Sequence, residues 1–171
     1  MKSKIVLRPV RYMDIPGMIR VNEECLQENY DRPFWEQQYH LGKNHTFVAV
    51  DGKEVIGYLL CNGELVVSLA LREAYRRKGI GKQLFHHCLN SFRSVLKPCV
   101  LNLHVRVSNK GAIALYTSLE FEIHETVPRY YLQPVEDAFH MRALLSPSMP
   151  LREEKKKMNV ELSVSMAVKK N

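Results

Sequence analysis

The sequence lacks several patterns that would assign it to a class at once. No run reaches the roughly 20 uncharged residues that a membrane-spanning helix needs, and Met1–Ser3 leads into a strand-like segment instead of a signal peptide. The four cysteines, Cys25, Cys61, Cys88 and Cys99, are far apart and form no C-x-x-C pair. We therefore expect a cytoplasmic protein with reduced thiols, no metal site and no membrane partner.

Length and charge limit the alternatives without choosing between them. The chain has 171 residues, 46% of them hydrophobic, with a formal net charge of +7. Because domains usually span roughly 100–200 residues, one domain is expected. The positive charge suits a polyanionic ligand, nucleic acid or an anionic surface equally well. No RNP or helix-turn-helix pattern supports specific nucleic-acid binding.

Hydrophobic periodicity predicts one domain that mixes strands and helices. Apolar runs and alternation predict strands at 5–8, 46–51, 54–61, 65–71, 100–107, 121–127 and 136–145. Helical spacing predicts helices at 12–26, with Asp14 as N-cap, at 80–92, and at 108–119, with Ser108 as N-cap. The segment 128–134 is predicted to be a loop. This order is typical of an α/β or α+β domain.

The chain changes character after Leu145. Prolines and a run of charged residues follow, which is typical of a solvated extension. We therefore divide the chain into a domain at 1–145 and an extension at 146–171. Apolar residues alternate with polar ones over 160–168, and this pattern predicts an extra strand without indicating its function.

The segment "YRRKGIGKQLF" places two glycines and four cations between a predicted strand and a predicted helix. The first turn of a helix leaves backbone N–H groups without intrahelical partners, and these groups favour anions. Gly79 and Gly81 would allow a diphosphate to approach the backbone closely. A solvated loop explains the segment equally well, because its spacing is neither the dinucleotide fingerprint nor the P-loop.

Several segments together resemble one family. Arg76–Gly81 matches the R/Q-x-x-G-x-G/A coenzyme A motif of the GNAT acetyltransferases, and it lies between a strand and a helix as that motif requires. The segments 26–30 ("LQENY"), 103–121 and 128–141 resemble the catalytic subunits of N-terminal acetyltransferases of the NatA and RimI type. The resemblance covers about Ile5 to Leu145, in the family's order.

The resemblance implies a fold, a reaction and partners. It implies the GNAT fold, a mixed twisted sheet of about seven strands with about four helices, whose central strands splay apart. It implies acetyl-CoA as co-substrate and the α-amino group of a protein N-terminus as acceptor, with a small or acidic first residue favoured. An auxiliary subunit or association with the ribosome is also implied.

The same resemblance assigns roles to individual residues. The implied coenzyme-binding residues are Leu69, Ala70, Leu71, Arg76, Arg77, Lys78, Gly79, Ile80, Gly81, Lys82, Asn109 and Tyr116. The implied peptide-binding residues are Leu26, Glu28, Tyr30, Tyr130 and Tyr131. The implied catalytic residues are His104, Tyr116 and Glu28.

The chemistry of acetyl transfer agrees with these roles but leaves alternatives open. His104, on the polar face of its strand, is of a type that ionises near pH 6.5 and could take a proton from an amine. Tyr116 could protonate the leaving thiolate, and Glu28 is a second candidate base or a peptide-positioning carboxylate. Each could instead be structural. A lysine or small-amine acetyltransferase, or a non-catalytic binding module, also remains open.

Overall fold

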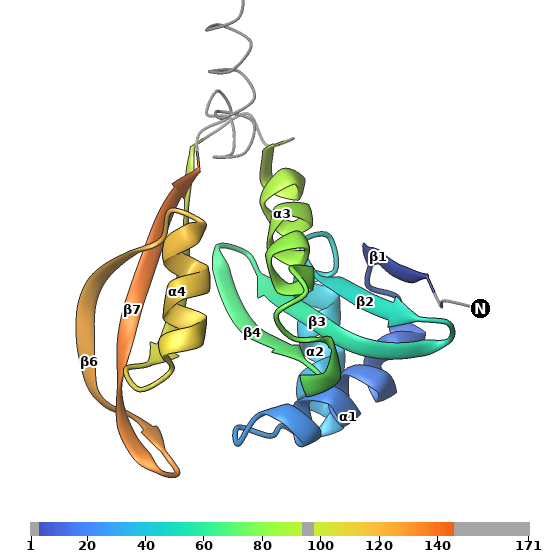
Figure 1. Cartoon of the computed structure of the whole chain (residues 1–171), viewed down its shortest axis with the longest axis horizontal. Helices are drawn as coiled ribbons and strands as arrows, with labels where there is room; N and C mark the ends of the chain where they lie inside the picture. The colour runs from blue at the N-terminus through green and yellow to red at the C-terminus, as the bar shows by residue number, and fades with distance from the viewer. Residues whose placement is uncertain (1–3, 94–97, 146–171) are drawn as a thin grey trace, which may run out of the picture.

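The computed structural model describes residues 4–93 and 98–145, and the strand predicted at 160–168 lies outside them (Figure 1). The strands are β1 (Ile5–Pro9), β2 (Phe47–Asp51), β3 (Glu54–Asn62), β4 (Leu65–Leu71), β5 (Cys99–Arg106), β6 (Glu122–Leu132) and β7 (Val135–Leu145). The α-helices are α1 (Ile15–Cys25), α2 (Arg32–Gly42), α3 (Ile80–Arg93) and α4 (Lys110–Ser118). The described ranges contain no helix long and apolar enough to cross a bilayer.

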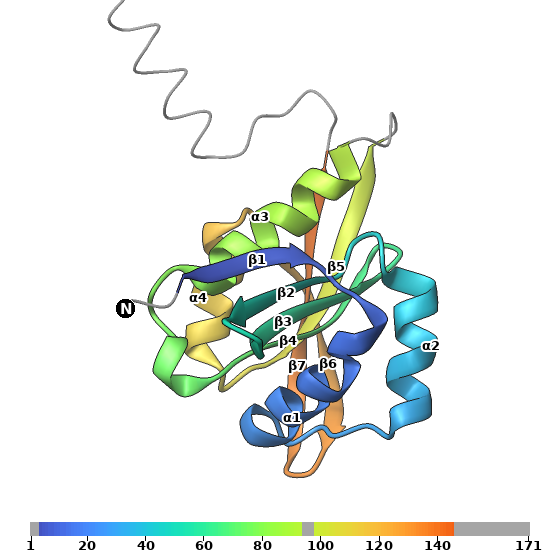
Figure 2. The same cartoon turned by 90° about the vertical axis from the view of Figure 1, so that its right-hand side faces the viewer.

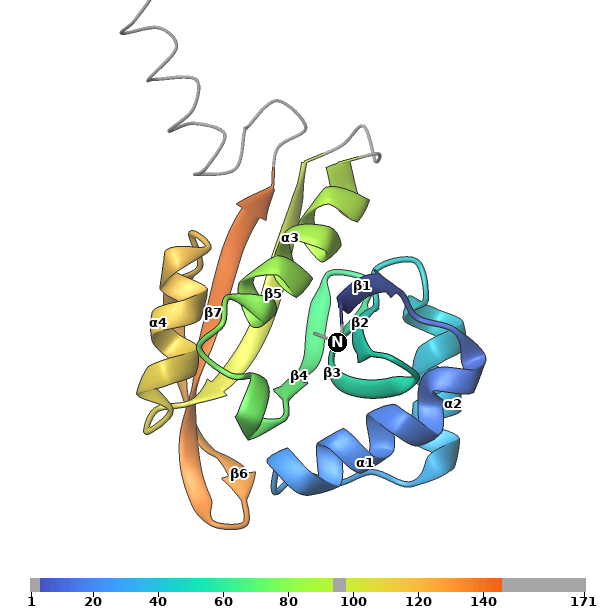
Figure 3. The same ribbon diagram turned by 45° about the vertical axis from the view of Figure 1, so that its right-hand side comes forward.

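The strands form one sheet that opens in the middle. Its order is β1-β2-β3-β4-β5-β7-β6, and of these neighbours only β4 and β5 run parallel. These two strands pair at a single position, Leu65 with Asn102, beside a 2.8 Å hydrogen bond from the Asn102 N–H to the Glu64 carbonyl. Figure 3 shows β4 and β5 diverging from there. The expected mixed sheet of seven strands, four helices and splayed central strands is confirmed.

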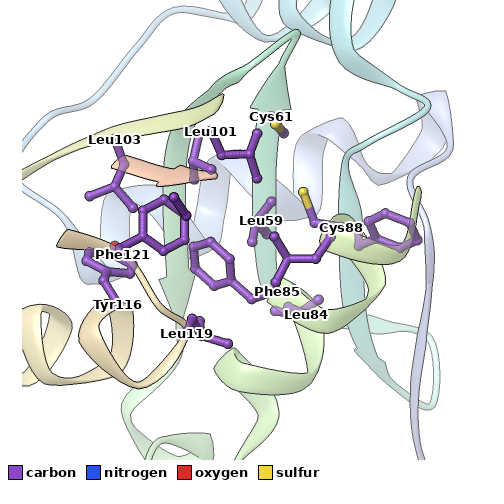
Figure 4. Packing of buried hydrophobic residues seen from close by; sticks show 14 of the residues in the cluster. Leu59, Cys61, Leu84, Phe85, Cys88, Leu101, Leu103, Tyr116, Leu119 and Phe121 are labelled. Carbon is purple, nitrogen blue, oxygen red and sulfur yellow. The ribbon is translucent and has the colours of Figure 1, made fainter. Parts of the chain in front are cut away.

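Helices cover both faces of the first half of the sheet (Figure 2). Along β2, Phe47 and Ala49 point to the core beneath α3 and α4, whereas Val48 and Val50 point to the core beneath α1 and α2. This alternation is what a strand buried on both faces requires. Figure 4 shows the aromatic side chains that join α3 to α4 in the first core.

Strand β5 has one apolar and one polar face, as its sequence predicts. Leu101, Leu103 and Val105 are buried in the first core. Asn102, His104 and Arg106 are half-buried and point to the opposite face, because neighbouring side chains of a strand alternate. The polar face of β5 is therefore available to build a site.

Helix α2 was not expected from the periodicity. Its N-cap is Asp31, whose carboxylate accepts a 3.1 Å hydrogen bond from the Phe34 N–H, and Pro33 occupies its first turn. These two local features are a sequence pattern for a helix start. Trp35, buried against Tyr58 with ring centroids 5.3 Å apart, fixes the helix on the sheet.

The predicted loop at 128–134 was wrong for most of its length. Strand β6 continues through Leu132, and only Gln133 and Pro134 separate it from β7. The pairing of β6 with β7 is irregular between Val127 and Tyr131, which is where a bulge accommodates Pro128 within an edge strand. The extended hairpin carries Tyr130 and Tyr131 beside β5.

Asp14 is the N-cap residue of α1, as predicted, whereas the prediction of Ser108 as N-cap of α4 was wrong. Asp14 precedes α1, but its carboxylate accepts hydrogen bonds from the Arg8 guanidinium (2.6 and 2.8 Å) and the Arg11 N–H (2.7 Å), and none from the first turn of α1. Helix α4 is capped by Asn109 instead of Ser108, since the Asn109 Oδ1 accepts from the Ala112 N–H at 3.0 Å.

Candidate active site

A cleft of about 500 Å³ lies where β4 and β5 diverge. Its walls come from the segment between α1 and α2, from β4, β5 and α4, and from the β6–β7 hairpin. It brings together every predicted peptide-binding and catalytic residue, namely Leu26, Glu28, Tyr30, His104, Tyr116, Tyr130 and Tyr131. Leu69 and Asn109, both predicted to contact the coenzyme, also line it.

On the edge of β4 that faces this cleft, backbone groups of Leu69 and Leu71 have no partner in β3, although the Leu71 carbonyl accepts from the Arg76 Nε and the Cys25 thiol. The Arg72 N–H donates to the Ile56 carbonyl, and the register then pairs Leu71 with Gly57 and Leu69 with Leu59. Because bonding alternates along an antiparallel pair, the backbone groups of Leu69 and Leu71 point away from β3, toward the cleft. By the same alternation the backbone of Ala70 points to β3, and its buried side chain packs in the core beneath α1.

The loop from Arg76 to Lys82 has the shape that an anion-binding turn needs. Gly79 lies at φ +78° and Arg77 at φ +57°, and helix α3 begins directly afterwards at Ile80. A Cβ placed on Gly81 would come within 3.6 Å only of the Leu115 side chain, so the protein itself leaves room there. The amides at the start of α3 and the exposed cations before it fit a diphosphate.

Two residues of this loop have roles inside the protein. The Ile80 side chain is buried, so only its backbone can contact a ligand. The Arg76 Nε donates a 2.9 Å hydrogen bond to the Leu71 carbonyl, which ties the loop to the end of β4. This hydrogen bond fixes the position of the loop relative to the end of β4 beside the cleft.

His104 projects from β5 into the cleft between two other rings. Its imidazole is stacked on Tyr130 (centroids 4.4 Å apart, planes at 8°) and on His140 (4.9 Å, 16°). Among the described residues, neither ring nitrogen has a hydrogen-bond partner within the protein. Burial, and secondarily the neighbouring His140, lowers the pKa of His104, so the ring is neutral near pH 7.

Tyr116 lines the inner wall of the cleft from α4. Its ring packs edge-on against Phe85 (centroids 5.6 Å apart), and Figure 4 shows it beside Phe121 and Leu103. Burial raises the pKa of Tyr116 to about 12, so the phenol keeps its proton at neutral pH. Within residues 4–93 and 98–145 its hydroxyl has no hydrogen-bond partner, which leaves the proton free to be donated.

Glu28 is engaged in an ion pair that spans the cleft. Its carboxylate accepts from the Arg106 guanidinium of β5, which also binds the Glu136 carboxylate at 3.1 Å and the carbonyls of Gln133 and Pro134. The guanidinium lies 4.0 Å from the centre of the Tyr131 ring. Glu28 therefore connects the α1–α2 segment to the hairpin, which favours positioning over proton transfer.

Aromatic rings surround the outer end of the cleft. Tyr30 stacks on Phe34 with centroids 4.1 Å apart, and the Tyr131 hydroxyl donates to the His104 carbonyl at 3.3 Å. Leu26 is half-buried against the core beneath α1. The Asn109 Oδ1 accepts a hydrogen bond as the helix cap, and the side-chain amide nitrogen of Asn109 remains available to a ligand.

Three residues around this site were not among the predicted site residues: Arg106 and Glu136, which line the cleft, and His140, which stacks on His104. Arg106 lies two residues from His104 on the same face of β5, and that spacing could have drawn attention to it. Glu136 and His140 enter only through the pairing of β5 with β7, which sets His104 opposite His140 and has no local pattern. The described part of the chain contains no group of three His, Cys, Asp or Glu side chains able to hold a metal.

Comparison with known proteins identifies the family to which the chain is similar. Residues 15–121 match the acetyltransferase (GNAT) family. The chain is similar to the N-alpha-acetyltransferase daf-31 of Caenorhabditis elegans (33% identity, 80% of each chain). It is also similar to the N-terminal acetyltransferase complex ARD1 subunit homolog of Dictyostelium discoideum (31% identity, 90% of this chain and 79% of the relative). Its fold is similar to that of Ard1 from Thermoplasma volcanium, with a TM-score of 0.76 at 23% identity over 82% of this chain and 97% of that chain.

Proposed function

Because the chain belongs to the acetyltransferase (GNAT) family, we propose that it transfers the acetyl group of acetyl-CoA to the α-amino group of protein N-termini. Membership of the family makes the protein an acetyl-CoA-dependent acetyltransferase. The choice of an α-amino group as the acceptor rests on the cleft, which leads from the edge of β4 to an end formed by Tyr30, Glu28 and the β6–β7 hairpin. The names of the relatives support the same acceptor.

Two parts of the co-substrate have candidate contacts. The diphosphate would lie on the backbone of Arg77–Lys82, and the extended arm would pair with the backbone groups of Leu69 and the N–H of Leu71. Bound there, acetyl-CoA supplies an activated acetyl thioester. Backbone N–H groups at the β4 edge would polarise its carbonyl, an effect often worth about 3 kcal/mol per donor.

Two protons must move during the reaction, and residues around the thioester would accept one and donate the other. An α-amine has a pKa near 8, so roughly a tenth of it is already neutral at pH 7, whereas a lysine side chain is almost wholly charged. As the amine nitrogen bonds to the acetyl carbon and the carbon–sulfur bond breaks, His104 accepts the amine proton through water. Tyr116 donates its proton to the departing thiolate. A weak base is enough for an α-amine, and a neutral imidazole meets that need.

Replacing Tyr116 by phenylalanine should lower kcat about tenfold or more, because the proton donor for the thiolate is removed. The affinity for acetyl-CoA should stay close to that of the wild type. The free energy of unfolding should change by less than about 1 kcal/mol, since no hydrogen bond within the described residues is lost. Steady-state kinetics, calorimetric titration with acetyl-CoA and chemical denaturation measure these three quantities. An unchanged kcat would remove Tyr116 from the mechanism.

A peptide panel tests the acceptor. The peptides share one sequence and differ only at the first two residues, and mass spectrometry follows their acetylation. We expect small or acidic first residues to react about tenfold faster than large apolar ones, a preference that rests on the family resemblance of Glu28–Tyr30 and Tyr130–Tyr131. An α-blocked peptide that contains lysine is the control. Faster turnover of that control would show that the acceptor is a lysine side chain.

Partners and location are further parts of the proposal. An auxiliary subunit is supported by the Dictyostelium relative, which is named as part of a complex. Association with the ribosome is proposed only from the family resemblance. All four cysteines are free, which supports a reducing compartment such as the cytoplasm.

A further inference from the structure

A short line of rings runs from the cleft to the outer strand of the sheet. His104 of β5 lies between Tyr130 and His140, and His140 in turn meets His124 of β6 edge-on, with centroids 5.5 Å apart and planes at 90°. His104 and His140 face each other because β5 and β7 pair at this position. Two imidazoles stacked 4.9 Å apart would repel each other strongly if both were charged.

Both nitrogens of His140 are engaged by other side chains. Its Nδ1 lies 3.1 Å from a carboxylate oxygen of Glu125, and its Nε2 lies 3.0 Å from the Oδ1 of Asn102. The orientation of the Asn102 amide is fixed independently, because its Nδ2 donates a 2.8 Å hydrogen bond to the Val100 carbonyl. An oxygen, and not an amino group, therefore faces the His140 Nε2.

Two acceptors require two donors. A neutral imidazole carries a single N–H, whereas the imidazolium carries one on each nitrogen. His140 can donate to both the carboxylate of Glu125 and the amide oxygen of Asn102 only if it is protonated. The ion pair with His140 also lowers the pKa of Glu125, chiefly through this hydrogen bond.

We propose that His140 is a positioning residue, an imidazolium held between the Glu125 carboxylate and the Asn102 amide oxygen, which keeps the adjacent His104 imidazole neutral and ready to accept a proton. The inference rests on the proposed function for its catalytic meaning, since His104 is the base only if the protein acetylates an amine. In this arrangement the charge on His140 of β7 decides which of the two stacked histidines is protonated. His104, which has no hydrogen-bond partner among the described residues, is then the one that remains free to accept a proton.

The charged and titratable groups around His140 agree with this assignment. Glu125 and His124 face it from β6, and Asn102 and His104 face it from β5. Arg142, two residues along β7, donates to the His124 Nε2 at 2.9 Å. The His124 Nε2 thus accepts from a cation, whereas the two nitrogens of His140 face two acceptors, so we place the positive charge next to His104 on His140.

Removing the charge of His140 should shift the rising limb of the profile of kcat against pH. In His140→Gln the like charge beside His104 is lost, so the pKa of His104 rises, and the rise of kcat with pH should shift upward by roughly 0.5–1 pH unit. At pH 6 kcat should then fall about twofold to threefold, while at pH 8 it should equal that of the wild type. His140→Arg keeps a positive charge and should leave the limb where it is.

The matched control is His124→Gln, which changes the neighbouring histidine of the same cluster without touching His104 and should leave the limb unmoved. NMR titration of the imidazole C–H signals, with His104 assigned from a His104→Asn sample, reads the same shift without any acetylation. A shift equal in His124→Gln and His140→Gln, or absent in a folded His140→Gln protein, would overturn the inference. Loss of turnover on every peptide with the NMR shift intact would instead overturn the proposed function.

Discussion

Replacing His104 by asparagine is expected to lower kcat by about 10²-fold or more, because asparagine keeps a polar side chain on that face of β5 but cannot accept the amine proton. The wild-type kcat should rise with pH as His104 loses its proton. Since burial and His140 lower the pKa of His104, this limb should lie below the value of about 6.5 that an unperturbed histidine would give. The variant should have no such limb. Steady-state kinetics at saturating acetyl-CoA between pH 5 and 9 measures both effects.

Glu28→Gln is the contrasting variant for this experiment. Glu28 is bound to Arg106, so its replacement should raise the KM for the peptide by loosening the α1–α2 segment and change kcat much less. In the His104→Asn variant, by comparison, the affinity for acetyl-CoA and the free energy of unfolding should both stay close to the wild-type values. If kcat instead fell 10²-fold in Glu28→Gln and stayed near normal in His104→Asn, the base would be Glu28.

Replacing Gly81 by valine is expected to weaken acetyl-CoA binding by about tenfold to hundredfold, because the added side chain occupies the space that the diphosphate needs at the start of α3. The protein alone should tolerate the change, since the nearest atom to a Cβ at this position is a Leu115 methyl group 3.6 Å away. Isothermal titration calorimetry of the purified variant gives the affinity.

Gly81→Ala separates binding from stability in the same experiment. Alanine favours a helix over glycine by up to about 1 kcal/mol, so this variant should be at least as stable as the wild type. Its affinity for acetyl-CoA should nevertheless fall, though less than that of Gly81→Val. Undiminished affinity in both folded variants would exclude this loop as the diphosphate site.

Local sequence patterns predicted most of the sheet and one side of the site. The alternation in β5 placed His104 on the polar face, and the glycine spacing marked the turn before α3, because both depend on residues close together in the chain. Helix α2 also had local features, Asp31 and Pro33, but it is mostly polar and buries only Trp35 and Gly42, so it has few apolar residues from which a helix could be predicted.

Local patterns of this kind could not predict contacts between segments that are distant in the sequence. Proline and paired tyrosines suggested a loop at 128–134, whereas pairing with β7 holds these residues in a strand through an irregular register. The pair His104–His140 depends on β7 entering the sheet between β5 and β6, against the order of the chain. The pair Arg106–Glu28 depends on the segment between α1 and α2 lying across the cleft from β5. No local pattern of the sequence carries that information.

The single pairing between β4 and β5 divides the catalytic machinery between two consecutive stretches of the chain. The diphosphate loop and the open strand edge belong to the first stretch, whereas His104 and Tyr116 belong to the second. The two stretches nevertheless share one hydrophobic core, in which Leu84 and Phe85 of α3 are clustered with Leu101 and Leu103 of β5 and with Phe121. The position of one stretch relative to the other therefore depends more on side-chain packing than on hydrogen bonding between strands.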